Sequence, residues 1–261
     1  MENAIVVKGL QTHYGDREIL KNISFTVPRG KTTVILGGSG CGKSTLLKHL
    51  IGLLKPTRGE IFINTKDITA MDDMELDEVR KKMGVLFQGA ALLNSMTVAD
   101  NVALPLREHT KLNESTIRIM VRMKLDLVGL SGFENFFPSQ LSGGMKKRAG
   151  LARAIAMDPE FLFFDEPSAG LDPLTAAGLD ELILKLRNVF GMTIVVVTHE
   201  LPSVFMIADY VIMLDAGDII FSGTLDELKS SENPRIRMFL ERKPEKEVYS
   251  PDDYFKIIAG D

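Results

Sequence analysis

The chain has 261 residues, of which 45% are hydrophobic and 25% are charged, and its formal net charge is -4. This length supports a large buried core, and the single cysteine, Cys41, excludes an internal disulfide framework and predicts a reducing compartment. A net negative charge disfavours a general nucleic-acid-binding surface, so we expect no nucleic-acid partner. The start, MENAIVVKGL, lacks the pattern of a signal peptide, and no apolar run reaches the length that spans a bilayer. We therefore expect a chain that is neither secreted nor membrane-spanning.

Short runs rich in β-branched and aromatic residues alternate with longer runs of helical period. The runs that predict strands are residues 4–10, 32–36, 60–64, 161–164, 193–198 and 210–214. The clearest helical periods are residues 43–54 and 174–190. This alternation is typical of an α/β fold with a largely parallel central sheet. From about Gly89 to Asp158 the pattern changes to helical periods and turns, which predicts an inserted helical subdomain.

The stretch GGSGCGKS follows a predicted strand, precedes a predicted helix and matches the pattern GxxxxGKS. Glycines let backbone N–H groups turn inward around phosphate oxygens, and the N-terminus of the next helix adds the positive end of its dipole. Lys43 is expected to reach the β- and γ-phosphates, and Ser44 to bind Mg²⁺. A glycine-rich turn that only caps a helix is the alternative, which the flanking elements disfavour. The residues expected to contact the nucleotide here are Gly37, Gly38, Ser39, Gly40, Cys41, Gly42, Lys43, Ser44 and Thr45.

Two acids end the apolar run FLFFDEP, residues 161–167. Because the run predicts a central parallel strand, Asp165 and Glu166 are expected at its carboxyl end, where such sheets bind ligands. Asp165 is expected to hold Mg²⁺ through water, and Glu166 to orient or polarise the water that attacks the γ-phosphate. His199, directly after another predicted strand, is interpreted as a γ-phosphate contact. The alternatives are ordinary polar residues at strand ends, with one acid capping a helix.

The segment QLSGGMKKRAGLARAIAMDPEFLFFDEPSAGLDP, residues 140–173, resembles the nucleotide-binding subunit of ABC transporters. The family signature LSGGQ appears here as LSGGM, and Met145 departs from it, which leaves contacts at that position open. The resemblance covers about residues 4–240. It implies a P-loop NTPase (RecA-like) core at 1–88 and 159–240 with an N-terminal antiparallel β portion. It also implies an inserted α-helical subdomain at about 89–158 and a C-terminal linker and tail at 241–261.

Further site residues follow from the same resemblance. Tyr14 resembles the aromatic residue that stacks on adenine, and Gln88 resembles the glutamine that senses Mg²⁺ and the attacking water. Asp172 resembles the loop residue that communicates across a dimer. We therefore expect ATP hydrolysis with Glu166, His199, Gln88 and Lys43 in the catalytic set, and Mg²⁺ held through Ser44, Gln88 and Asp165.

Ser142, Gly143 and Gly144 resemble the signature that closes over the γ-phosphate of the opposite subunit. A serine followed by two glycines supplies a hydroxyl, exposed amides and a helix N-terminus, an anion site that the chain's own phosphate loop does not need. Taken alone, a serine that caps a helix would explain the same letters. The resemblance implies a head-to-tail dimer of two copies with two ATP molecules at the interface.

The chain carries no charged residue from Phe87 to Ala99, in the region where the family receives a coupling helix of the membrane subunit. Several residues of this region are also expected to be core: Ala90, Leu92, Leu93, Val98, Val102 and Leu104. Residues 89–110, with SGGM and FFDEPSAGLDP, resemble the ATPases of the Mla/Mce-associated lipid transporters. This resemblance implies phospholipid transport between inner and outer membranes, which maintains outer-membrane lipid asymmetry. It also implies a multi-pass permease, an Mce-domain lipid-binding protein and a small STAS-domain protein as partners, and it places this chain on the cytoplasmic face of the inner membrane.

Other functions stay open at this point. The cargo could be an amino acid, a peptide or a drug, and a soluble ABC ATPase such as a cluster-assembly factor would fit the length. A nucleotide-binding scaffold without turnover is disfavoured because Lys43, Asp165, Glu166 and His199 are all present. The tail at 248–261 is interpreted either as a frayed end or as a contact with a partner subunit.

Overall fold

The computed structural model describes residues 2–243, and the chain divides after Leu225 into two compact units. The first unit contains both β-sheets and the helices α1 to α7. The short helix α8, Leu225–Lys229, begins at the last residue of the first unit. The second unit contains α9, Pro234–Leu240. The predicted tail at 248–261 lies outside the described residues. Among residues 2–243, no helix combines the length and apolar character needed to cross a bilayer.

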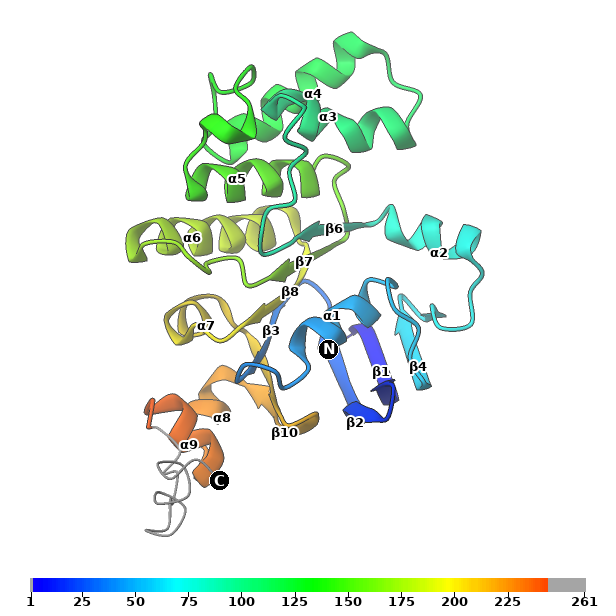
Figure 1. Cartoon of the computed structure of the whole chain (residues 1–261), viewed down its shortest axis with the longest axis vertical. Helices are drawn as coiled ribbons and strands as arrows, with labels where there is room; N and C mark the ends of the chain where they lie inside the picture. Colours follow the sequence, from blue (N-terminus) through cyan, green and yellow to red (C-terminus); the bar gives the residue numbers. More distant parts are fainter. Residues whose placement is uncertain (1, 244–261) are drawn as a thin grey trace, which may run out of the picture. The chain divides into compact units, whose positions relative to one another are not determined.

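Six strands form the larger sheet, in the order β10-β9-β3-β8-β7-β6 (Figure 1). Their bounds are β3 Thr32–Gly37, β6 Met83–Leu86, β7 Phe161–Asp165, β8 Thr193–Thr198, β9 Tyr210–Asp215 and β10 Asp218–Thr224. Strands β9, β3, β8, β7 and β6 are parallel, and β10 pairs antiparallel with β9 with a register irregularity between Ile219 and Phe221. The predicted α/β class with a largely parallel sheet is confirmed.

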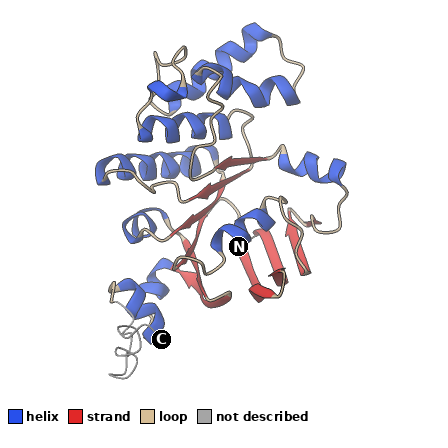
Figure 2. Ribbon diagram, in the orientation of Figure 1, coloured by secondary structure: helices blue, strands red, loops and turns tan. Residues whose placement is uncertain are grey.

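A second sheet of four antiparallel strands, in the order β2-β1-β4-β5, is built from the N-terminal part of the chain (Figure 2). Its strands are β1 Asn3–Tyr14, β2 Arg17–Pro28, β4 Arg58–Ile63 and β5 Lys66–Asp67. The turn between β1 and β2 uses Gly15 at a φ of 59°, which a glycine adopts without strain. This sheet confirms the expected N-terminal antiparallel β portion.

The main core lies between the two sheets and is built around α1, Lys43–Leu50. Leu46 and Leu50 of α1 are buried in one hydrophobic cluster with Ile5 of β1 and Phe163 of β7. Phe164, the next residue of β7, is equally buried and points to the opposite face because successive strand residues alternate. Helices α6, Pro173–Phe190, and α7, Leu201–Ile207, cover that opposite face (Figure 1). Burial on both faces fixes the parallel strands and therefore the edge at which their carboxyl ends meet.

Residues 89–158 contain no strand and fold into four helical elements (Figure 2). These are α3 Val98–His109, α4 Glu114–Leu127, the 3-10 helix η1 Pro138–Gln140 and α5 Gly143–Ala154. The chain leaves the sheet after β6 and returns at β7, its hydrogen-bonded neighbour. Helix α2, Asp73–Arg80, precedes β6.

The uncharged run after Gln88 forms both core and surface. Ala90 and Val102 are buried, whereas Leu93 is 43% exposed. The buried side chain of Asn101 bonds to backbone groups between residues 93 and 97, which fixes the loop ahead of α3. The expectation that several residues of this region belong to the core is confirmed.

Candidate functional site

The loop from Gly37 to Ser44 joins β3 to α1 at the carboxyl edge of the larger sheet. A Cβ at Gly37 would lie 2.4 Å from the carbonyl oxygen of Leu214, and one at Gly42 would lie 2.8 Å from Leu20 Cδ2. Gly42 also has a φ of 106°, so only glycine fits there without strain. A Cβ at Gly38 or Gly40 would meet nothing within 4 Å. The loop is therefore packed on one side and open on the other, as a phosphate cradle requires.

Lys43 lies buried at the start of α1 with its side chain turned onto the loop. Its Nζ donates to the carbonyl oxygens of Gly37 and Gly38, both at 2.9 Å, and lies 4.0 Å from Glu166 Oε1. The ammonium thus stands between the open loop and the acidic strand end. A phosphate in the loop would meet a positive charge that is already in place.

Ser44 and Asp165 meet across the site. Ser44 Oγ donates to Asp165 Oδ1 at 3.2 Å. Burial raises the pKa of Asp165, and the hydrogen bond from Ser44 opposes that rise. A hydroxyl and a carboxylate beside a phosphate loop are oxygen ligands of the kind that Mg²⁺ binds, so these residues fit that ion.

Glu166 follows Asp165 and adopts a φ of 47°, a left-handed conformation that is uncommon outside glycine. Its backbone N–H donates to the carbonyl oxygen of Val197 at 2.8 Å. Its Oε1 lies 2.9 Å from Nδ1 of His199, while its buried Oε2 has no hydrogen-bond partner among the described residues. The structure therefore brings Lys43, Glu166 and His199 together around one carboxylate.

Gln88 and Tyr14 lie at other strand ends. Gln88 is exposed two residues beyond β6, and the pairing of Leu86 with Phe164 puts it at the same sheet edge as Glu166. Tyr14 ends β1 in the smaller sheet and is 49% exposed. An exposed aromatic ring of this kind can stack on a planar base.

The remaining loop residues differ in exposure. Ser39 is exposed, whereas Thr45 is half-buried on α1. Cys41 is buried, and burial raises the pKa of its thiol. This setting supports Cys41 as a small packing residue rather than a reactive thiol.

The signature residues lie in the helical segment, at the start of α5. Ser142 is the N-cap, and its Oγ accepts from the backbone N–H of Met145 at 3.3 Å. A Cβ at Gly144 would lie 2.5 Å from Thr175 Cγ2 of α6, so close packing explains that glycine. In the part of the chain that is described, no hydrogen bond or ion pair joins Ser142 to the phosphate loop. Figure 1 shows α5, which begins with these residues, apart from α1, which follows the phosphate loop.

Asp172 is the N-cap of α6. Its Oδ1 accepts from the backbone N–H groups of Leu174 and Thr175, both at 3.1 Å. Hydrogen bonds, above all from Thr175, hold the pKa of Asp172 below its usual range. The neighbouring Leu174 is 86% exposed, so an apolar side chain stands on the surface beside this cap.

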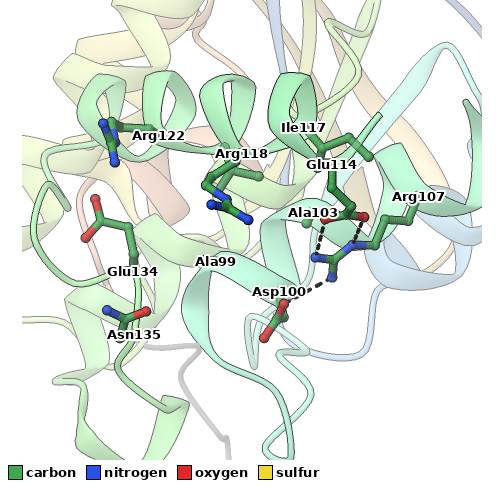
Figure 3. Close-up of a pocket in the computed structure, with 11 residues that line it drawn as sticks. Ala99, Asp100, Ala103, Arg107, Glu114, Ile117, Arg118, Arg122, Glu134 and Asn135 are labelled. Carbon is green, nitrogen blue, oxygen red and sulfur yellow. Dashed lines mark hydrogen bonds and ion pairs between the residues drawn. The ribbon is translucent and has the colours of Figure 1, made fainter. Parts of the chain in front are cut away.

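Two hollows open on or beside the helical segment. The first, of about 500 Å³, lies beside β6 and is lined by Val85, Phe87, Leu104, Pro105 and Met157, with charged residues such as Arg80 and Glu108 among them. The second, of about 460 Å³, lies between α3 and α4 (Figure 3). There Arg107 donates to both Asp100 and Glu114.

One residue near the site is not found by the sequence reasoning. Lys147 is 6% exposed, and its Nζ donates to the backbone carbonyl of Glu166 at 3.2 Å. The available signal was the helical period of α5, which places Lys147 on the same face as the buried Gly150 and Leu151.

Comparisons with known proteins agree with this geometry. A family model described as ABC transporter matches residues 20–169. The intermembrane phospholipid transport system ATP-binding protein MlaF of Haemophilus influenzae is 45% identical over 260 residues, 98% of each chain. The Escherichia coli K12 protein of that name is 46% identical over 239 residues, 92% of this chain and 89% of its own. The probable ribonucleotide transport ATP-binding protein mkl of Mycobacterium leprae is 46% identical over 237 residues, 91% of this chain and 68% of its own.

Solved structures give the same result. The dimeric post-hydrolysis state of the ATP-binding cassette MJ0796 bound to ADP and Pi has a TM-score of 0.79 at 32% identity, covering 85% of this chain and 98% of that chain. The cbiO1 protein of Clostridium perfringens, part of the ABC transporter complex cbiONQ, has a TM-score of 0.81 at 31% identity, covering 92% and 100%. Because the phosphate cradle and the acidic strand end occupy this shared fold, the chain is an ATP-binding ATPase subunit that belongs to the ABC transporter family.

Proposed function

We propose that this chain is the ATP-hydrolysing subunit of a transporter that moves phospholipid between the inner and outer membranes. The observation that carries the proposal is the cluster of Lys43, Glu166 and His199 at one sheet edge. The near full-length similarity to proteins named for intermembrane phospholipid transport supports the cargo. Because one relative is named as a probable ribonucleotide transport protein, ribonucleotide is the alternative cargo to exclude.

The site holds a carboxylate that can act as the base for water. His199 Nδ1 lies 2.9 Å from Glu166 Oε1, and the buried Oε2, which has no partner among the described residues, would accept the proton of a water admitted to the site. Lys43 would neutralise charge on the β- and γ-phosphates. Bound Mg²⁺ would add Lewis-acid stabilisation of the phosphate oxygens, held through Ser44, Asp165 and Gln88.

Each copy of the chain would supply one half of each of two ATP sites. The phosphate loop forms one half, and the N-terminus of α5, with Ser142, Gly143 and Gly144, forms another anion site on a separate surface. We infer a head-to-tail dimer in which the α5 end of one copy closes over ATP held by its partner, with Tyr14 stacked on adenine. Asp172, at the nearby N-terminus of α6, would lie at the same interface.

The membrane partner would dock beside the helical segment. The hollow of about 500 Å³ beside β6 is lined by apolar and charged residues, which suits a short amphipathic helix of a permease. We assign residues 89–158 to a helical subdomain and 1–88 with 159–240 to the core. An Mce-domain lipid-binding protein and a small STAS-domain protein complete the proposed complex, in which this chain lies on the cytoplasmic face of the inner membrane.

Purification of the native membrane complex tests this function. The expected result is co-purification of a multi-pass permease and an Mce-domain protein, with phospholipid bound at a stoichiometric level. Recovery of bound ribonucleotide, amino acid, peptide or drug would contradict phospholipid as the cargo. Recovery of the chain without any membrane subunit would favour a soluble ABC ATPase such as a cluster-assembly factor.

A further inference from the structure

Lys147 is a buried charged residue on the helix that begins with the signature. It is 6% exposed and lies five residues after Ser142 in α5. Its ammonium contacts the backbone carbonyl of Glu166 at 3.2 Å, on a strand end that belongs to the core sheet. The contact therefore joins the helical segment to the acid that carries the proposed chemistry.

Glu166 needs such support because of its backbone conformation. A non-glycine residue at a φ of 47° is strained, and such strain persists only where the surroundings hold it. The N–H of Glu166 is held by the carbonyl oxygen of Val197, and its carbonyl accepts from Lys147 Nζ and from the N–H of Ala169 at 3.2 Å. Of these donors and acceptors, only Lys147 contributes a side chain.

Burying this ammonium is costly. Burial lowers the pKa of Lys147, while Asp165 and Glu166 act in the opposite direction. An apolar side chain of similar size would fill the position without that cost, and such replacements of buried charges are often neutral or stabilising. Packing therefore does not explain a lysine here, whereas a directed hydrogen bond from a positive charge does.

We propose that Lys147 is a positioning residue for ATP hydrolysis, which holds the backbone of Glu166 and thereby sets the direction of its carboxylate. This inference rests on the proposed role of Glu166. Because α5 also begins with Ser142, the same helix would contact the partner's ATP at one end and orient its own chain's Glu166 further along.

The test is Lys147→Met in the full-length chain, which keeps most of the length of the side chain and removes the charge and the donor. We expect kcat to fall about 10-fold or more, as for a lost hydrogen bond from a charged group, with the KM for ATP within about twofold. The midpoint of thermal unfolding should be unchanged or higher. Lys147→Gln, which keeps an N–H donor, should recover part of kcat.

The matched control is Lys146→Met, which removes the same charge from the neighbouring, half-buried residue. An equal loss in this control, a kcat per folded molecule near the parent value in Lys147→Met, or an effect on KM alone would each overturn the inference. Glu166→Gln is measured in parallel. Parent-like turnover in Glu166→Gln would overturn the proposed site itself. A strong loss of turnover in Glu166→Gln together with parent-like turnover in Lys147→Met would overturn only the role of Lys147.

Discussion

At the scale of single residues, Glu166 is the most constrained group of the site. Its carboxylate is held by His199 on one oxygen, and its backbone is held on both sides of a left-handed residue. Such preorganisation reduces the rearrangement needed when charge develops on the transferred phosphate. It also makes the chemistry of this one carboxylate easy to isolate by mutation.

Glu166→Gln should bind ATP and hydrolyse it about 100-fold more slowly or worse, because the amide keeps the size but cannot accept the proton from water. Single-turnover hydrolysis and equilibrium ATP binding measure the two effects separately. Glu181→Gln, an exposed change on α6, is the control. A Glu166→Gln chain with the parent rate would remove this residue from its proposed role.

Lys43→Ala should reduce hydrolysis about 100-fold or more, because it removes a charge that is already placed at the phosphate loop. Nucleotide binding should weaken as well, since ground-state phosphates use the same contact. Steady-state ATPase assays with Lys55→Ala, an exposed lysine, as control check this. Near-normal hydrolysis would contradict the assignment of the cradle.

The site residues differ in how readily the sequence predicts them. Lys43, Ser44, Asp165 and Glu166 stand in short motifs beside strongly apolar strands, so their meeting at one sheet edge follows from topology. The contact of Lys147 with Glu166 depends on how α5 packs against the larger sheet, which no local pattern specifies. The separation of Ser142 from the chain's own phosphate loop likewise appears only in three dimensions.

At the scale of elements, α3 and α4 are joined by the ion pair of Arg107 with Glu114, and Arg107 also pairs with Asp100 of its own helix. Hydrogen bonds from Thr97 and Arg107 lower the pKa of Asp100, and one from Arg107 lowers the pKa of Glu114. Stability from these depressed carboxyl groups is present above their ordinary pKa values of 3.8 and 4.5 and is lost as the pH falls through the lowered values.

Arg107→Met should therefore lower the thermal midpoint at pH 7, and the difference from the parent should close as the pH falls below about 4. Circular dichroism melts across pH 2.5 to 7 measure this. Arg122→Met is the control, since Arg122 lines the same hollow (Figure 3) without an ion pair among residues 2–243. A difference that stays constant with pH would contradict the assigned cause.

The predicted elements are those with the strongest burial pattern. Strands β3, β7 and β8 are buried on both faces and appear as continuous apolar runs. The sequence reasoning missed β2, whose exposed residues interrupt the apolar ones, and β6, which has only four residues. It also missed β10, in which Gly223 is the only buried residue. Partial exposure weakens the hydrophobic periods by which both helices and strands are predicted.

At the scale of the whole molecule, the two anion sites predict association that depends on ATP. In a Glu166→Gln background, ATP should convert monomer to dimer, and Ser142→Asp should prevent it. Aspartate caps helices as well as serine does, so α5 stays intact while a carboxylate opposes the partner's γ-phosphate. Analytical ultracentrifugation with Ser139→Asp, an exposed residue of η1, as control measures this. If Ser142→Asp forms as much dimer as the Ser139→Asp control, the proposed interface is wrong.

The edges of the larger sheet have a consequence for aggregation. One edge is β6, with four residues, and the other is β10, whose ladder is interrupted between Ile219 and Phe221. Short or irregular edges are poor templates for strand addition by another chain. Polymerisation of copies through these sheet edges is therefore disfavoured.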